Sequence, residues 1–264
     1  MAQGNGNRNG KGGESPPTED GAKPHYRTVF VSDVHMGSSV SQCGRLVEFL
    51  KSVSVDRLCL VGDIVDMYAL KRRFQWSQEY NSLIRRVFKM AKKGVKVVYV
   101  PGNHDGDLRG LANMDFAGIK IMKRYIHQTA DGKRLLVIHG DEFDGVLRER
   151  LMFLYECGDF SYEMAVRVGW LITPVLSRFF GVQWSLSKYL KSKVKNVVKF
   201  INSYERLVMT EGRHQKVDGV VTGHIHTAEL KTINGLLYAN CGCWTESCEA
   251  IVEHGDGRLE LLRL

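Results

Sequence analysis

Short runs of β-branched and aliphatic residues alternate with helical patterns in the first half of the chain. The runs 28–31, 57–61 and 95–100 predict buried strands. Between these runs, apolar residues recur at the spacing of one helix face, first over 46–53 and then over 83–91. Strands that alternate with helices are typical of βαβ units and a parallel sheet, so this half of the chain predicts an α/β fold.

The second half contains more strands and three predicted hairpins. A run at 217–222 predicts one buried strand. Tight-turn dipeptides separate the other predicted strands and favour antiparallel pairing. The pairs and their turns are 124–129 with 133–138 around Asp131-Gly132, 228–233 with 236–240 around Asn234-Gly235, and 248–253 with 258–263 around Asp256-Gly257.

Two segments interrupt this pattern of strands. Residues 1–24 are too polar to offset the entropy of ordering them, so we expect a disordered tail followed by one domain over 25–264. Residues of about 145–214 have little strand character and predict a helical insertion that caps the site described below. One predicted helix face within this insertion is formed by Leu190, Val194, Val197, Ile201, Tyr204 and Val208.

Composition and charge limit the class of protein. The chain has 264 residues, of which 44% are hydrophobic, and can bury a large core. Its formal charge of +8 favours an anionic partner such as a phosphate, nucleic acid or an acidic membrane surface. Six cysteines lie without zinc-ribbon or redox spacing, which indicates reduced thiols in a cytoplasmic protein. We expect no secretory signal and no spanning helix.

Side chains of the types that bind metals follow five of the predicted strands. Because the carboxyl ends of parallel strands meet at one edge of a sheet, we expect these side chains to form one site. A single such cluster is more often an ordinary loop, and the interpretation rests on all five together. The clusters are Asp33-Val34-His35, Gly62-Asp63-Ile64-Val65-Asp66, Gly102-Asn103-His104-Asp105, His139-Gly140-Asp141 and Gly223-His224-Ile225-His226.

The chemistry of these clusters predicts a dinuclear metal site. Asp33 and His35 lie two apart on a segment expected to be extended, so both side chains should leave on one face. Asp63 carries two oxygens that can each bind a different ion. Mixed nitrogen and oxygen donors without thiolate suit Mn²⁺ first, and also Fe or Zn²⁺. Two ions about 3.5–4 Å apart would hold a shared hydroxide and polarise a phosphoryl group. The candidate ligands are Asp33, His35, Asp63, Asn103, His139, His224 and His226.

The ordered motifs D-x-H, G-D-x-x-D, G-N-H-D, H-G-D and G-H-x-H, over residues 33–226, resemble those of the calcineurin-like metallophosphoesterase superfamily. The resemblance implies a four-layer α/β/β/α sandwich and a metal-dependent phosphoester or pyrophosphate hydrolase. It implies that His104, oriented by Asp66, stabilises the transition state or protonates the leaving oxygen. Asn103 and His104 would also contact substrate. The implied ligand sets are Asp33, His35, Asp63 and His226 for one metal, and Asp63, Asn103, His139 and His224 for the other.

Within that superfamily the chain is similar to the bacterial UDP-2,3-diacylglucosamine pyrophosphatase-like branch, by its size, its insertion after H-G-D and its segment 242–247. The resemblance implies a UDP-sugar lipid or other lipid-linked phosphate as substrate, in lipid A biosynthesis at the cytoplasmic face of the inner membrane. Peripheral membrane contact is expected, and a stable nucleic-acid partner is not. His104 stands where the lipid A enzyme carries arginine, and Cys243 where a polar residue or alanine is expected.

Two other functions stay open. One is a soluble phosphatase or phosphodiesterase acting on nucleotides, nucleic acid or phosphoprotein, and the other is a non-catalytic metal-binding scaffold. Lys188, Lys191 and Lys195 continue to Lys199 as a basic helical stripe, which is either a solvated face or a site for substrate phosphates and acidic headgroups. The apolar segment 170–180 is either core or a groove for an acyl chain or membrane.

Overall fold

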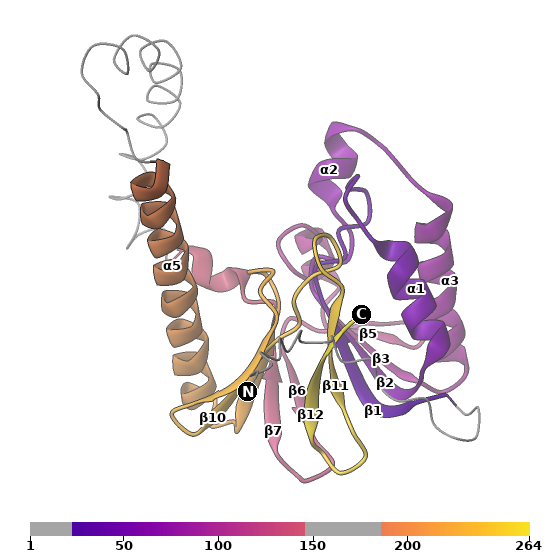
Figure 1. Ribbon diagram of the computed structural model, residues 1–264. Coiled ribbons are helices and arrows are strands. Elements are labelled where there is room, and N and C mark those ends of the chain that lie inside the picture. Colours follow the sequence, from indigo (N-terminus) through magenta and orange to yellow (C-terminus); the bar gives the residue numbers. More distant parts are fainter. Residues whose placement is uncertain (1–22, 146–185) are drawn as a thin grey trace, which may run out of the picture.

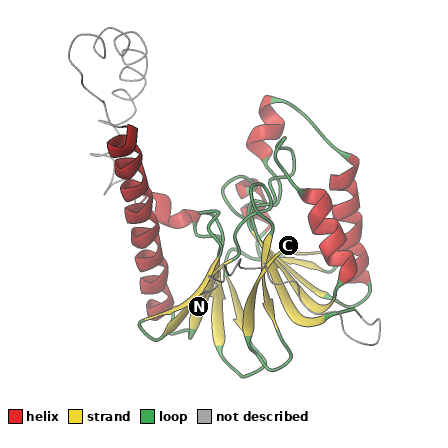
Figure 2. Cartoon of the chain, viewed as in Figure 1, coloured by secondary structure: helices red, strands yellow, loops and turns green. Residues whose placement is uncertain are grey.

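The computed structural model describes residues 23–145 and 186–264, and only the backbone for 186–197. Two β-sheets face each other, and helices cover both outer sides (Figures 1 and 2). Helices α1 (Cys43–Ser52) and α3 (Gln78–Lys92) cover the first sheet, and α5 (Leu186–His214) covers the second. The predicted α/β/β/α sandwich is therefore confirmed.

The first sheet has seven strands in the order β12-β11-β1-β2-β3-β5-β4. Its centre is parallel, with β2 between β1 and β3, as the βαβ pattern predicted. The predicted C-terminal hairpin of β11 and β12 joins it antiparallel to β1. The strands are β1 (His25–Val31), β2 (Ser54–Val61), β3 (Lys96–Val100), β4 (Asp115–Phe116), β5 (Ile119–Ile121), β11 (Glu249–Glu253) and β12 (Leu259–Arg263).

The second sheet has five strands in the order β6-β7-β8-β10-β9. Strand β7 is parallel to β8, while β6 with β7 and β9 with β10 form the two other predicted hairpins. The turn residues Asn234 and Gly235 have φ of 49° and 82°, the left-handed conformation that such a turn requires. The strands are β6 (Tyr125–Gln128), β7 (Arg134–Val137), β8 (Gly219–Thr222), β9 (Glu229–Ile233) and β10 (Leu236–Asn240).

Three apolar clusters fill the spaces between the four layers. Leu46 and Leu83 pack from the helices onto the first sheet, and Phe30 and Val221 belong to the cluster between the sheets. Each layer therefore buries its apolar side chains against the next, as a layered sandwich requires. The third cluster packs α5 on the second sheet and is formed by Leu136, Ile138, Tyr204, Val208, Met209, Val217, Val220 and Tyr238.

Short elements connect the layers at the edge where the strands end. They are α2 (Met67–Arg72) and the 3₁₀ helices η1 (Gly106–Leu111) and η2 (Asp141–Phe143). The sequence did not predict α2, η1 or the β4–β5 pair, because elements of two to six residues carry too few positions to show a period.

The predicted insertion of about 145–214 is described only where α5 runs. Tyr204 and Val208, from its predicted apolar face, are fully buried against the second sheet. This part of the chain therefore forms an outer layer of the sandwich. The segment 170–180 and most of the predicted tail lie outside the described residues. Among the helices the structure describes, none combines the length and apolarity needed to cross a membrane.

Candidate metal centre

The predicted ligands gather where parallel strands of both sheets end. Asp33 and His35 follow β1, and Asp63 and Asn103 follow β2 and β3 in the first sheet. His139 follows β7, and His224 and His226 follow β8 in the second sheet. Because these loops meet at one edge of the sandwich, residues almost 200 positions apart come within contact distance.

The backbone at these positions is strained. Nine non-glycine residues of the described chain have positive φ, and five of them are candidate ligands. The left-handed conformation costs a residue with a Cβ about 1 kcal/mol or more. The expectation that Asp33 and His35 project from an extended segment is therefore wrong, and sharp turns bring them together instead. The five ligands are Asp33, His35, Asp63, His224 and His226, with φ of 53°, 49°, 53°, 71° and 51°.

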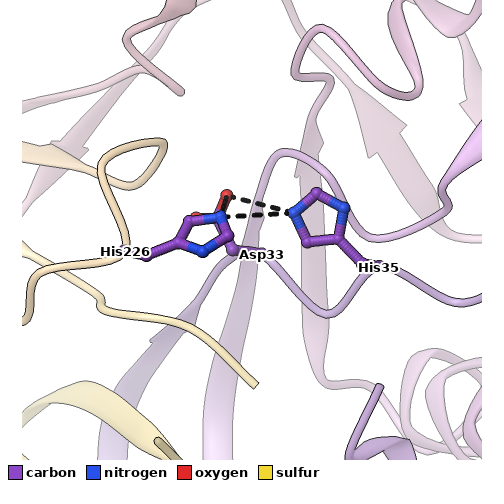
Figure 3. Close-up of side chains that lie close together, drawn as sticks. All are labelled: Asp33, His35 and His226. Carbon is purple, nitrogen blue, oxygen red and sulfur yellow. Dashed lines mark hydrogen bonds and ion pairs between the residues drawn. The ribbon is translucent and has the colours of Figure 1, made fainter. Parts of the chain in front are cut away.

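Asp33, His35 and His226 form the first cluster. Figure 3 shows the three side chains pointing toward one another. His226 Nε2 lies 3.2 Å from Asp33 Oδ1 and 3.3 Å from His35 Nε2, and His35 Nε2 lies 3.7 Å from Asp33 Oδ1. Ligands that share an ion at about 2.1 Å lie about 3 Å apart, so this cluster fits one cation.

Asp63, His139 and His224 form the second cluster, and Asp63 connects it to the first. Asp63 Oδ2 lies 3.3 Å from His139 Nε2 and 3.9 Å from His35 Nε2. One ligand atom from each of the three residues lies within 4.8 Å of the others. Asp63 therefore lies between two clusters that each fit one cation, which is the position that a bridging carboxylate requires.

Several buried polar atoms at this edge have no hydrogen-bond partner. Three of them belong to candidate metal ligands, namely Asp33 Oδ1, Asn103 Oδ1 and His139 Nε2. His139 Nδ1 faces the carbonyl of Val61 at 2.9 Å and must donate to it, which leaves Nε2 as the nitrogen that could bind a metal. A buried polar atom without a partner costs about 1–3 kcal/mol. The donor set therefore fits divalent metal ions, which would satisfy all three atoms.

The pKa values of the site's imidazoles also fit a cation-binding role. Burial favours the neutral form of His139, but the Asp63 carboxylate 3.3 Å away and the charge of Asp33 outweigh it and raise its pKa to about 10. The Asp33 carboxylate, 3.2 Å from His226 Nε2, raises the pKa of His226 to about 10 as well. In the metal-free protein, protons on these imidazoles thus balance the carboxylates that a cation would otherwise balance.

His104 and Asp66 lie beside the second carboxylate. His104 Nδ1 is 3.0 Å from Asp66 Oδ1, and His104 Nε2 is 3.9 Å from Asp63 Oδ2. Asp66 Oδ1 also accepts from the backbone of Ala69, as the N-cap of α2. Burial raises the pKa of Asp66, but the hydrogen bond from the backbone of Ala69 and the neighbouring His104 imidazole outweigh it and lower the pKa, so the carboxyl is ionised. The His104 side chain is 29% exposed, so it lies at the surface of the site.

Two glycines let the loops approach this closely. A Cβ on Gly62 would collide with the ring of His139, and one on Gly102 would collide with Asp63 Oδ1. Gly62 also has φ of 81°. Gly62 of the G-D motif is thus needed for space and for conformation, and Gly102 of the G-N-H-D motif is needed for space.

Three acidic residues near the motifs have different roles from one another. Asp105 is fully buried and accepts hydrogen bonds from the backbone of Ile64 and Gly102, so it ties the loop after β2 to the loop after β3. Asp141 instead forms a two-bond ion pair with Arg109. Asp144 Oδ1 lies 2.8 Å from His224 Nε2.

Two further contacts were not predicted. The buried hydroxyl of Tyr204 on α5 lies 2.6 Å from Thr222 Oγ1, and Thr222 donates to the carbonyl of His139. Burial raises the pKa of the Cys243 thiol, but hydrogen bonds, first that from His226, lower it to about 6. The apolar helix face contained Tyr204, but nothing in the sequence distinguished its hydroxyl. The side chains of Lys188, Lys191 and Lys195 lie outside the described residues, and Lys199 is exposed.

A family model described as calcineurin-like phosphoesterase matches residues 26–228. The chain therefore belongs to the calcineurin-like phosphoesterase family.

Curated relatives are distant. The chain is 23% identical over 264 aligned residues to the DNA polymerase II small subunit of Methanothermobacter thermautotrophicus, covering 85% of this chain and 48% of that protein. It is 29% identical over 126 residues to the UDP-2,3-diacylglucosamine hydrolase of Neisseria meningitidis serogroup B, covering 45% of this chain and 49% of that protein. The chain thus spans about half the length of these relatives.

Solved structures with a similar course of the chain include an archaeal phosphodiesterase, with a TM-score of 0.44 and 13% identity, covering 90% of this chain and 99% of that one. Another is a single mutant of Vps29 from Entamoeba histolytica, with a TM-score of 0.43 and 11% identity, covering 90% of this chain and 98% of that one.

Proposed function

We propose that this protein hydrolyses phosphoester or pyrophosphate bonds with two divalent cations, Mn²⁺ by preference. The observation that carries the proposal is the set of buried, unpartnered donor atoms on Asp33, Asn103 and His139, gathered from two sheets at one edge. The cations would be held in the two ligand sets that the sequence motifs imply, with Asp63 shared between them. Cations in such a pair activate water and neutralise charge on a phosphoryl group.

The chain's own residues position the substrate and move the proton. His104 is held at Nδ1 by Asp66, which leaves Nε2 to face the phosphoryl group and donate a proton to the leaving oxygen. The buried Asp66 stays ionised and keeps the imidazole oriented. Asn103 and His104 are adjacent on one loop, so the same turn that offers a cation ligand also places the acid.

As the substrate class we propose a lipid-linked nucleotide diphosphate sugar, similar to UDP-2,3-diacylglucosamine. The alignment with the Neisseria hydrolase and the basic stripe of Lys188, Lys191 and Lys195 support this class. The stripe would bind the diphosphate or acidic headgroups. The reaction would then take place at the cytoplasmic face of the inner membrane.

Substitution of the proposed ligands tests the activity. Purified protein with Mn²⁺ should hydrolyse a chromogenic phosphodiester, and Asp63→Ala and Asn103→Ala should each abolish turnover without changing the circular dichroism spectrum. Asp107→Ala is the matched control, because Asp107 is an exposed carboxylate on nearby η1. Turnover that survives both ligand substitutions contradicts the proposed site, and no turnover in any protein with Mn²⁺, Fe or Zn²⁺ supports the scaffold alternative.

Product analysis tests the substrate class. With a UDP-diacylated sugar, we expect UMP and a lipid phosphate at a higher kcat/KM than with free nucleotides or oligonucleotides. A preference for nucleotides, oligonucleotides or phosphopeptides identifies a soluble phosphodiesterase or phosphatase instead.

A further inference from the structure

Large aromatic side chains are exposed on α2 and the residues after it, which we call the α2 corner (67–76). Phe74 is 76% exposed, Tyr68 53% and Trp76 36%. Helix α2 itself has no buried residue. Side chains of this size bury 150–250 Å² each in a core, so three exposed together indicate a surface that contacts something else.

Basic residues lie between these aromatic residues. Lys71, Arg72 and Arg73 are all exposed. Of the three, Lys71 alone has a carboxylate partner in the described part of the chain, at 3.5 Å on exposed Asp107. The corner therefore combines apolar area with a net positive charge.

The α2 corner lies beside the candidate metal centre. Asp66, which contacts His104, is also the N-cap of α2, and the ring of Tyr68 lies edge-on to His104 with centroids 5.1 Å apart. Figure 1 shows α2 projecting beyond the sheets at its end of the molecule. A partner bound at the α2 corner is therefore held next to His104 and the candidate metal centre.

We propose that the α2 corner docks the protein on an anionic lipid surface. Aromatic rings with polar tips favour the interface between headgroups and acyl chains, and adjacent lysine and arginine side chains are attracted to anionic headgroups. Single-stranded nucleic acid also binds aromatic and basic side chains, but it needs open aromatic faces. Phe74 and Trp76 are stacked on each other, with centroids 6.4 Å apart at 11°, so one face of each ring is already covered, and Trp76 and Tyr80 pack at 75°. Lipid is therefore the favoured partner of the α2 corner, and this proposal does not depend on which substrate the protein hydrolyses.

Flotation with vesicles tests the proposal. Full-length protein should float with vesicles that contain phosphatidylglycerol and remain unbound with phosphatidylcholine alone. Phe74→Ser with Trp76→Ser should lower the bound fraction at least tenfold. Arg72→Gln with Arg73→Gln should lower binding by about fivefold for each charge removed. Phe116→Ser is the matched control, because Phe116 is 65% exposed but lies on the edge strand β4.

Two outcomes overturn the proposal. One is unchanged flotation in both double variants, or an equal loss in the Phe116→Ser control, with all proteins folded by circular dichroism. The other is binding of single-stranded DNA that the same double variants lose while none of the proteins floats. Activity on a soluble phosphodiester is measured in parallel, so a missing hydrolase activity is distinguished from a missing lipid surface.

Discussion

His104 and Asp66 lie 3.0 Å apart at the start of α2, and the same carboxylate that contacts the imidazole also accepts from the backbone of Ala69. The carboxylate that caps α2 thus fixes the orientation of His104, the proposed general acid. A capping carboxylate cannot rotate away without losing a backbone hydrogen bond, so the imidazole is held in one position before substrate arrives.

Replacement of His104 by asparagine should slow turnover according to the leaving group. General acid catalysis contributes about 10²–10⁴-fold when the leaving oxygen is basic, and much less when it is a good leaving group. We therefore expect a large loss of kcat for alkyl phosphodiesters and a small one for nitrophenyl esters. Asp66→Asn should show the same dependence more weakly. An equal loss for both esters would assign His104 to cation or substrate binding instead of proton transfer.

Binding of Mn²⁺ should release protons and strengthen as the pH rises. The pKa values of His139 and His226 are about 10 in the metal-free protein, so both imidazoles carry a proton at neutral pH that a cation must displace. Calorimetry in buffers of different ionisation enthalpy measures the protons released. Metal at a hundred times its Kd should add about 2.7 kcal/mol to the free energy of unfolding. Binding that is independent of pH between about 6 and 9 would contradict the assigned ligands.

The buried pair of His127 and Glu253 should make the protein sensitive to acid. The two side chains are fully buried and 2.7 Å apart, and they connect β6 of the second sheet to β11 of the first. Burial raises the pKa of Glu253, but the hydrogen bonds from His127 and its other partners lower it to about 2, so its stabilisation is complete above about pH 4.5 and is lost toward pH 2. Burial also lowers the pKa of His127, so protonation below its ordinary pKa of about 6.5 destabilises the fold further.

Glu253→Gln tests this pair. The substitution leaves His127 and Arg27 without their carboxylate and should cost about 3 kcal/mol at neutral pH. It should also flatten the loss of stability between about pH 4.5 and pH 2. Urea unfolding across this range measures both effects, with the exposed Glu48→Gln as the control. A variant as acid-sensitive as the parent would show that other carboxylates control the transition.

Tyr204→Phe should weaken metal binding indirectly, because Tyr204 supports a candidate ligand and is not itself one. Its hydroxyl holds Thr222, which in turn holds the carbonyl of His139. Removing such support for a ligand lowers metal affinity by about 10–100-fold. The loss of a buried hydrogen bond should cost about 1 kcal/mol of stability. Titration of Mn²⁺ into Tyr204→Phe and into the exposed control Tyr68→Phe distinguishes the effect from that of any tyrosine near the site.

The sequence predicted the layers of the fold and the ligand clusters because both depend on local patterns. A strand of four to eight apolar residues can be recognised from its own sequence, and each candidate ligand lies in the loop that follows such a strand. The left-handed turns at Asp33 and His35 were not predicted, since no propensity favours them there and tertiary contacts impose them. The contact of Asp144 with His224 joins residues 80 positions apart, and no spacing in the sequence reveals such a pair.

The candidate ligands come from two independent sheets, with Asp33, His35, Asp63 and Asn103 on one and His139, His224 and His226 on the other. In the proposed assignment each cation has ligands from both. The ions would thus crosslink the two sheets in addition to taking part in the reaction. Chelation should therefore weaken the packing between the strands of one sheet and those of the other.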